Sequence, residues 1–186
     1  MRFIDTRHDR WHLVTGEDGP IPHPDPFPNQ LLTLEQWHAV RDTWPSGLPT
    51  GLVLPNTLDV DTLASDVRGP KARLSLLVLQ FPKWTDGRAY SQARVLRSRH
   101  AFDGEVRATG EVLVDMMPLL QRTGFDAAQM RHDQRVEDAV RALGFFPGHY
   151  QGDVIEPRPA FARNLAAETA ADKLRDNAEL FAGQGI

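Results

Sequence analysis

Residues 74–81 read LSLLVLQF and decide the fold expected of this chain. Nearly every position is apolar, whereas a strand with one solvent-exposed face would alternate apolar and polar residues. A short apolar run of this kind is typical of a strand that is covered on both faces, as in a parallel sheet. The run therefore predicts the central strand of an α/β fold.

Strand-like and helix-like segments alternate around this run. The expected strands lie at 52–54, 74–81, 105–109 and 127–130. The expected helices lie at 60–67, 89–99, 111–122 and 136–143. Apolar residues recur at steps of three and four in the later helices, and Pro118 should kink its helix or end it early. Short connections between alternating strands and helices are typical of βαβ crossovers and a parallel sheet.

The four βα units at 51–144 are too few for an eight-unit barrel of about 250 residues. The sequence therefore predicts an α/β fold: an open parallel sheet or a partial (β/α) barrel of about four βα units, with N-terminal edge strands and a C-terminal helical tail. Residues 51–151 are the expected α/β core. Residues 152–186 are the expected helical extension, which packs on its own domain or partly frays or, alternatively, docks onto a second subunit of a homo-oligomer.

Residues 1–50 are expected to hold N-terminal strands, a proline-rich connector and a short helix. The two expected strands lie at 2–4 and 11–14. Four prolines keep residues 21–29 extended, because proline removes a backbone donor and blocks a helix interior. Thr33 and Gln36 have the spacing of a capping box at the start of a helix at 34–43.

Composition excludes several kinds of chemistry. The formal net charge of -4 argues against a nucleic-acid-binding protein, and the lack of cysteine excludes disulfides, cysteine-ligated clusters and a cysteine nucleophile. The histidines lie on separate expected elements, so no metal site is expected. Residues 1–12 lack an apolar signal core and no later run is long enough to cross a membrane, so a cytoplasmic protein is expected.

Three segments should reach the carboxyl ends of the strands, where ligands of open α/β sheets bind. They lie at 81–92, 107–111 and 129–132, and the first is rich in polar and aromatic groups. Asp86 can cap the following helix, Gly87 permits a close approach, and Arg88 can hold an anion at the free N–H groups of that helix. The alternative is an ordinary turn in which Arg88 pairs with Asp86 or Glu111.

Positive charge gathers between residues 83 and 107. This stretch contains six basic residues and three acidic ones. The basic residues are Lys83, Arg88, Arg94, Arg97, Arg99 and Arg107, and the acidic residues are Asp86, Asp103 and Glu105. A basic patch on an acidic protein favours a small oxyanion or an acidic partner, and the alternative is a solvated helix face. Arg88 and Arg107 are predicted to share one anion site, unless Arg107 forms a salt bridge with Glu111 or Asp115 instead.

Two runs of sequence carry a resemblance to a known family. They read FPKWTDGRAYSQAR at 81–94 and GEVRATGEVLVD at 104–115, and GFDA follows at 124–127. Over residues 54–151 the chain resembles the domain-of-unknown-function family nine-three-four. Members of that family are bacterial proteins labelled as oxidoreductases involved in sulfite reduction, and their genes commonly lie beside that of a sulfite reductase. The chain departs from the family at Met116, where glutamine is usual, and at Gln129, where glutamate is frequent.

The resemblance implies a set of candidate binding positions. They are Asp86, Gly87, Arg88, Tyr90, Ser91, Arg107, Gly110 and Asp115. We expect an accessory protein of assimilatory sulfite reduction whose basic surface binds a small oxyanion, sulfite reductase or another acidic protein. The alternative is a small-molecule enzyme with a polar site at the carboxyl ends of the parallel strands. The sequence leaves the cofactor and any catalytic residues open, because it has neither cysteine nor a dinucleotide-binding fingerprint to support the oxidoreductase label.

Overall fold

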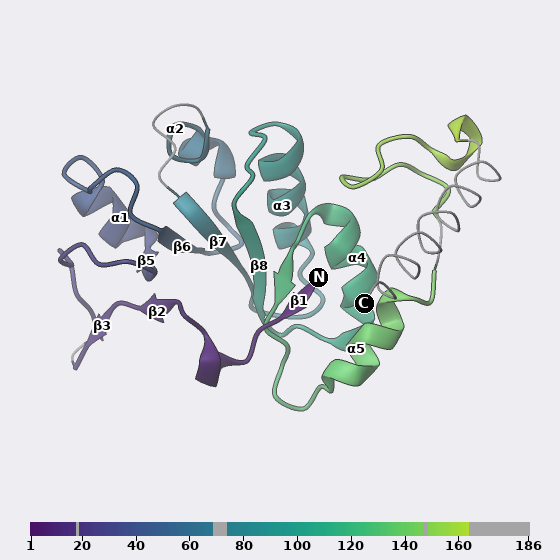
Figure 1. Ribbon diagram of the computed structural model, residues 1–186, viewed down its shortest axis with the longest axis horizontal. Helices are drawn as coiled ribbons and strands as arrows, with labels where there is room; N and C mark the ends of the chain where they lie inside the picture. Colours follow the sequence, from purple (N-terminus) through teal and green to yellow (C-terminus); the bar gives the residue numbers. More distant parts are fainter. Residues whose placement is uncertain (18, 69–73, 147–148, 164–186) are drawn as a thin grey trace, which may run out of the picture. The chain divides into compact units, whose positions relative to one another are not determined.

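A parallel sheet organises residues 1–145 of the computed structural model (Figure 1). In spatial order its seven strands are β1 (Arg2–Phe3), β9 (Ala127–Ala128), β8 (Glu105–Gly110), β7 (Leu74–Phe81), β6 (Thr50–Leu54), β5 (Gln30–Thr33) and β2 (His12–Leu13). Every neighbouring pair is parallel. The sheet curls into part of a barrel, which confirms the expected fold class.

The structure describes residues 1–17, 19–68, 74–146 and 149–163. Residues 1–145 form one compact unit, and residues 146–186 belong to a second. In the second unit, the Ala160 N–H donates to the Tyr150 carbonyl over 2.9 Å, and the Tyr150 and Phe161 rings lie 6.0 Å apart. Only a 3-10 turn at Ala160–Ala162 is helical in the described part of this unit. Most of the expected helical tail, residues 164–186, lies outside the described residues.

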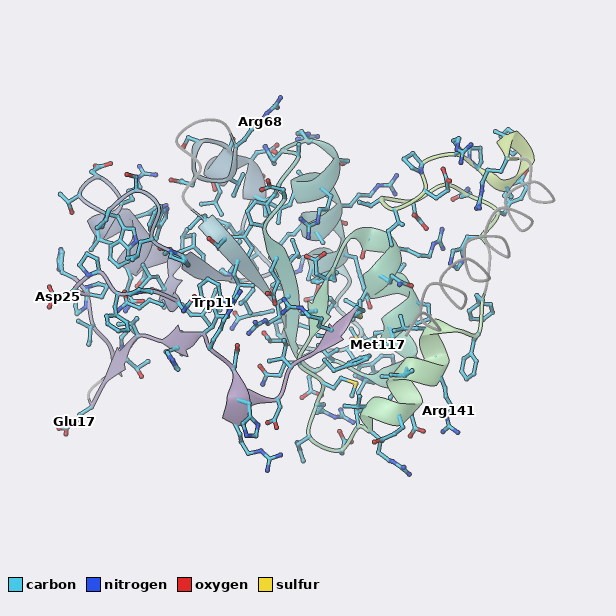
Figure 2. All side chains as sticks on the ribbon, viewed as in Figure 1. Trp11, Glu17, Asp25, Arg68, Met117 and Arg141 are labelled. Atoms are coloured by element: carbon cyan, nitrogen blue, oxygen red, sulfur yellow. The ribbon has the colours of Figure 1, made fainter. Side chains whose placement is uncertain are left out.

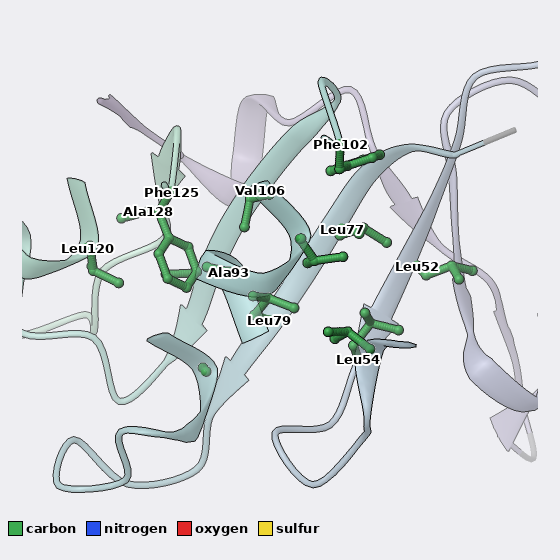
Figure 3. Packing of buried hydrophobic residues seen from close by; sticks show 14 of the residues in the cluster. Leu52, Leu54, Leu77, Leu79, Ala93, Phe102, Val106, Leu120, Phe125 and Ala128 are labelled. Atoms are coloured by element: carbon green, nitrogen blue, oxygen red, sulfur yellow. The ribbon is translucent and has the colours of Figure 1, made fainter. Parts of the chain in front are cut away.

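The central strand β7 is buried on both faces, as its sequence predicts. Leu77, Leu79 and Phe81 pack into the large core under the helices, and all three are fully buried. Leu76 and Val78 point to the opposite face and are also buried. Figure 3 shows Leu77 and Leu79 beside side chains of β6 and β8. The strand therefore anchors two separate apolar clusters.

The helices cover one face of the sheet. They are α1 (Leu34–Val40), α2 (Ala64–Val67), α3 (Arg88–Ser98), α4 (Met117–Thr123) and α5 (Val136–Leu143). Their buried side chains, such as Trp37, Leu96 and Leu120, join the same cluster as Leu77 of β7. The helices thus bury one face of the sheet and leave the other for residues of the N-terminus.

Three local expectations are revised or completed by the structure. Pro118 lies in the first turn of α4 instead of kinking a longer helix, because proline lacks only an N–H that the first turn leaves unbonded. A 3-10 turn at Val114–Met116 precedes that helix. The strand expected at 127–130 ends at Ala128.

The capping box at the start of α1 is confirmed. The Thr33 N–H donates to Gln36 Oε1 over 2.8 Å, and the Gln36 N–H donates to Thr33 Oγ1 over 3.2 Å.

Strand β5 was not predicted from the sequence. It pairs with β6, and together with α1 it adds a βα unit to those expected after residue 51. A second feature that the sequence did not predict is a small antiparallel hairpin of β3 (Thr15–Gly16) and β4 (Gly19–Pro20). The N-terminal residues are therefore part of the sheet itself.

Both edges of the sheet come from one N-terminal segment. Strand β1 lies beside β9 at one edge, β2 lies beside β5 at the other, and residues 4–11 connect them (Figure 1). We call residues 4–11 the strap. Six strand spacings on a flat sheet would measure about 29 Å. The chain from Phe3 to His12 reaches only about 26 Å, because Thr6–His8 form a 3-10 turn. The strap is therefore too short for a flat sheet, but it fits a curled one.

Trp11 fixes the strap to the face of the sheet that the helices leave open. The Trp11 side chain, labelled in Figure 2, is 6% exposed. It packs with Leu31, Leu76 and Val78. Its Cζ3 atom lies 3.2 Å from the place that a Cβ of Gly51 would occupy, so glycine permits this close packing. The indole N–H is buried and has no acceptor among the described residues.

We predict that replacing Trp11 with Ala destabilises the fold far more than replacing it with Phe. Trp11→Ala should lower the free energy of unfolding by about 3 kcal/mol, because it opens a cavity between strap and sheet. Trp11→Phe should cost about 1 kcal/mol, since it keeps a ring and loses no hydrogen bond. Urea denaturation measures both, with Trp84→Ala, at a 55% exposed residue, as the control. Stability equal to the parent in Trp11→Ala would contradict the packing.

Candidate functional site

Segments that follow three strands meet at the carboxyl edge of the sheet. Asp5 and Thr6 follow β1, Glu111 follows β8, and residues 129–132 follow β9. They surround a cavity of about 460 Å³, which we call the mouth: Ile4, Asp5, Thr6, Gly110, Glu111, Gln129, Met130, Arg131 and His132. Two of the three segments expected at the strand ends, 107–111 and 129–132, thus contribute to one cavity.

A groove between the strap and the open face of the sheet adjoins the mouth. It has a volume of about 330 Å³ and is lined by Thr6, Asp9, Trp11, Leu13, Leu31, Val53, Val78, Arg107, Thr109 and Gln129. Thr6 and Gln129 line both spaces. We call this space the carboxyl-side groove, because Thr109 and Gln129 place it toward the carboxyl ends of β8 and β9.

A chain of charged residues around the buried Arg107 lies at the other end of the groove. Arg107 is 3% exposed and donates to Glu105 Oε1 over 3.0 Å and to the carboxylate of Asp9 on the strap. Arg2 of β1 donates to the other oxygen of Glu105. Because Val106 and Ala108 face the helices, Glu105 and Arg107 face the strap. Two guanidinium groups and two carboxylates balance, so the chain of charges is neutral in sum.

Asp5, Glu111 and Arg131 of the mouth all form ion pairs, some of them with residues outside it. Arg131 donates to Glu111 over 2.8 Å and to both oxygens of Asp133 over 2.6 and 2.7 Å. The hydrogen bonds from Arg131 lower the pKa of Asp133 to about 2. The hydrogen bonds from Arg7 hold the pKa of Asp5 well below its usual range. Asp5 and Asp133 are therefore ionised at neutral pH and unsuited to act as general acids.

The groove contains neutral polar side chains that form no hydrogen bond with the rest of the described protein. Among the described residues, the side chains of Thr6, Thr109 and Gln129 have no hydrogen-bond partner. A hydroxyl and a carboxamide each offer both a donor and an acceptor. The groove therefore offers neutral hydrogen bonding beside the apolar surface of Val53 and Val78.

The loop after β7 forms a separate polar cluster. Asp86 accepts hydrogen bonds from Arg88 Nε over 2.9 Å, from Arg88 Nη2 over 2.6 Å and from Asn56 Nδ2 over 2.8 Å. The bonds from Arg88 are the main cause of a pKa for Asp86 that lies well below its usual range. Gly87 has a φ of -82°, and a Cβ there would meet only Tyr90 at 3.7 Å. The structure therefore uses neither a positive φ nor an unusually close contact at Gly87.

The other candidate positions have mainly structural roles. Gly110 has a φ of 96°, and a Cβ there would lie 2.4 Å from the Phe81 carbonyl oxygen, so this position requires glycine. The Tyr90 ring packs against Phe81 at 5.1 Å and Phe125 at 6.4 Å. Ser91 and Asp115 are exposed on α3 and on the turn before α4.

The shared anion site of Arg88 and Arg107 is not formed. Arg88 begins α3 on the helix-covered side and pairs with Asp86. Arg107 lies on the strap side and pairs with Asp9 and Glu105 instead of the expected Glu111 or Asp115. Residues on one strand alternate between the faces of a sheet, and this alternation places Arg107 away from α3. Segment 81–92 accordingly lies outside both the groove and the mouth.

No described group of three or more His, Asp or Glu side chains has the arrangement of a metal site. None of the described helices is long and apolar enough to cross a membrane.

We predict that Tyr90 in the folded protein remains protonated at pH 10, where an exposed tyrosine ionises. Burial, followed by the negative charge of Asp115, raises the pKa of Tyr90 to about 12. The pKa of Tyr90 is therefore higher in the folded protein than its value of about 10 in the unfolded chain, so the protonated phenol stabilises the fold relative to the phenolate. This stabilisation is complete below pH 10 and is lost as the pH rises toward 12. Absorbance at 295 nm of the parent minus that of Tyr90→Phe isolates the titration. Ionisation of Tyr90 near pH 10 in the folded protein would contradict its burial.

The comparisons with known proteins give one match. A family model for bacterial proteins of unknown function, DUF934, matches residues 51–161. The match includes β6 to β9 and α2 to α5, whereas the strap, β1, β2 and β5 lie before it. No curated protein and no solved structure matches. Because the family model covers more than half of the sequence, the chain belongs to the DUF934 family of bacterial proteins.

Proposed function

We propose that this protein is an accessory component of assimilatory sulfite reduction that docks onto an acidic surface of sulfite reductase. The observation that carries the proposal is Trp84, which is 55% exposed on the loop after β7. We call residues 82–87 the Trp84 loop. The link to sulfite reduction rests on the label that members of this family carry.

Hydrogen bonds within the Trp84 loop and from Asn56 and Arg88 hold this loop in one shape. The Asp86 N–H donates to the Lys83 carbonyl over 3.0 Å, and the Asp86 carboxylate accepts from the buried Asn56 and from Arg88. A preorganised loop loses little conformational freedom on binding. Tryptophan is among the residues that contribute most to protein–protein interfaces. An exposed tryptophan on a fixed loop therefore favours docking over a role in stability.

Ion pairs do not neutralise all of the basic residues on this loop and in the segment that follows it. Of the six basic residues between 83 and 107, Arg97 pairs with Asp126, Arg99 with Asp61, and Arg107 with Asp9 and Glu105. Lys83 and Arg94 form no ion pair within the described residues. Arg94 lies on the exposed side of α3, about 9 Å along the helix from Arg88. This local excess of positive charge on a protein of net charge -4 favours an acidic partner surface.

The alternative role as a small-molecule enzyme finds less support in the candidate binding positions. Asp86 and Arg88 lie on the Trp84 loop and its helix, Arg107 lies on the opposite face, and Tyr90 is packed against aromatic rings. These residues do not line one cavity. A docking role needs only the exposed groups of the loop and of α3.

We predict that Trp84→Ala and Arg94→Glu each weaken binding to sulfite reductase from the same bacterium by at least about tenfold. Removing the indole reduces the area that is buried at the interface with sulfite reductase. Reversing the charge at position 94 places a carboxylate next to the acidic surface of the partner, which repels it. Isothermal calorimetry on the full-length protein measures the dissociation constants, which should also rise with salt. Arg135→Glu makes the same charge change on the exposed end of α5, and Phe145→Ala removes another exposed ring.

Both control variants should bind like the parent. Loss of binding in Arg135→Glu as large as in Arg94→Glu would show that net charge, and not the Trp84 loop, determines the affinity. Absence of any interaction with sulfite reductase, or equal affinities of parent and Trp84→Ala, would refute the proposal.

A further inference from the structure

We propose that the carboxyl-side groove binds a small uncharged molecule that has an apolar body and one hydrogen-bonding end. This site lies on the strap side of the sheet and does not depend on docking through the Trp84 loop. Its ligand class follows from four properties of the groove: its floor, its polar end, its charge and its size.

The floor of the groove is apolar. Val53 and Val78 are partners in the register of β6 and β7, so their side chains stand next to each other on the open face. Leu31 of β5 extends this surface, and Trp11 of the strap packs over it. A ligand that displaces water from these side chains gains the free energy of apolar burial.

The polar end lies beside this floor, toward the carboxyl edge. Arg107 pairs with Ala127 and Ala108 with Ala128 in the register of β8 and β9. Thr109 is the next residue after Ala108 and Gln129 is the next residue after Ala128, so the two lie side by side. Both lie on the strap side of the sheet, the side to which Arg107 points. Their side chains have no partner among the described residues, and they offer a hydroxyl and a carboxamide to one ligand group.

The charge of the groove excludes a small anion as the preferred ligand. Arg107 is its positive group, and Asp9 and Glu105 already neutralise it. An anion near Arg107 would also approach the Asp9 carboxylate, which lines the groove. The Arg107 guanidinium has no free pair of N–H groups for an oxyanion. We therefore replace the expectation of an anion at Arg107 with that of an uncharged ligand in the groove.

The size of the groove sets the size of the ligand. Its volume of about 330 Å³ is near the lower end of the range of about 300–1,000 Å³ that ligand sites span. An aliphatic ring or a system of one or two aromatic rings with one amide group has suitable dimensions and the required pattern of polarity. An amide has the same hydrogen-bonding groups as the Gln129 side chain, so two parallel hydrogen bonds between them are feasible.

The test uses matched pairs of probes that differ mainly in charge. The pairs are benzamide with benzoate, nicotinamide with nicotinate, and indole-3-acetamide with indole-3-acetate. Methyl NMR spectra of the full-length protein follow the signals of Leu31, Val53 and Val78 during titration. We expect at least one amide to shift these signals, and its carboxylate partner to bind at least about tenfold more weakly, because of Asp9 and Glu105.

Two variants connect the binding to the polar end. Thr109→Val removes the hydroxyl at nearly constant volume and should weaken the amide at least about threefold. Thr85→Val makes the same change on the Trp84 loop and should leave the affinity unchanged. Thermal melting checks that both variants are folded.

Any of three results would overturn the proposal: no amide shifts the three methyl signals, amide and carboxylate bind equally well, or Thr109→Val binds every probe like the parent. None of these results would affect docking through the Trp84 loop, because that test measures binding to sulfite reductase by a different surface.

Discussion

The ion pairs of the buried Arg107 guanidinium hold the N-terminal strap on the sheet. Asp9 belongs to the strap and Glu105 belongs to β8, so Arg107 has both partners only when the strap crosses the open face. A buried charge without its partner costs several kcal/mol, which opposes any other path of the strap. The same crossing brings Trp11 over Gly51, places β1 and β2 at opposite edges, and requires a curled sheet. The groove exists because the strap is held above Val53 and Val78.

The two faces of this sheet have different consequences for function. The helix-covered face carries a closed core, so its binding groups are limited to exposed loops and helix surfaces such as Trp84 and Arg94. The strap-covered face is only partly filled and retains unpaired polar groups at Thr109 and Gln129. A partner protein and a small molecule would therefore occupy different surfaces, and each can be removed by substitution without removing the other.

The sequence predicted those features that depend on local pattern and missed those that depend on distant contacts. The apolar run at 74–81 predicted β7, and Thr33 with Gln36 predicted the start of α1. Strand β5 was missed because its four residues follow a proline-rich stretch and give too short a pattern. The partner of Arg107 on the strap could not be found by spacing, since Asp9 lies 98 positions away. The pairing of Thr109 with Gln129 depends on strand register, which a single sequence does not specify here.

A double-mutant cycle between Asp9 and Arg107 tests the position of the strap most directly. The free energies of unfolding of the parent, Asp9→Asn, Arg107→Met and the double variant come from urea denaturation. The account predicts a coupling energy of at least about 1.5 kcal/mol, because each single change leaves a buried charge without this partner. The same cycle with Asp5→Asn, whose carboxylate pairs with Arg7, should be additive. Additivity within about 0.5 kcal/mol for Asp9 and Arg107 would contradict a strap that crosses the sheet.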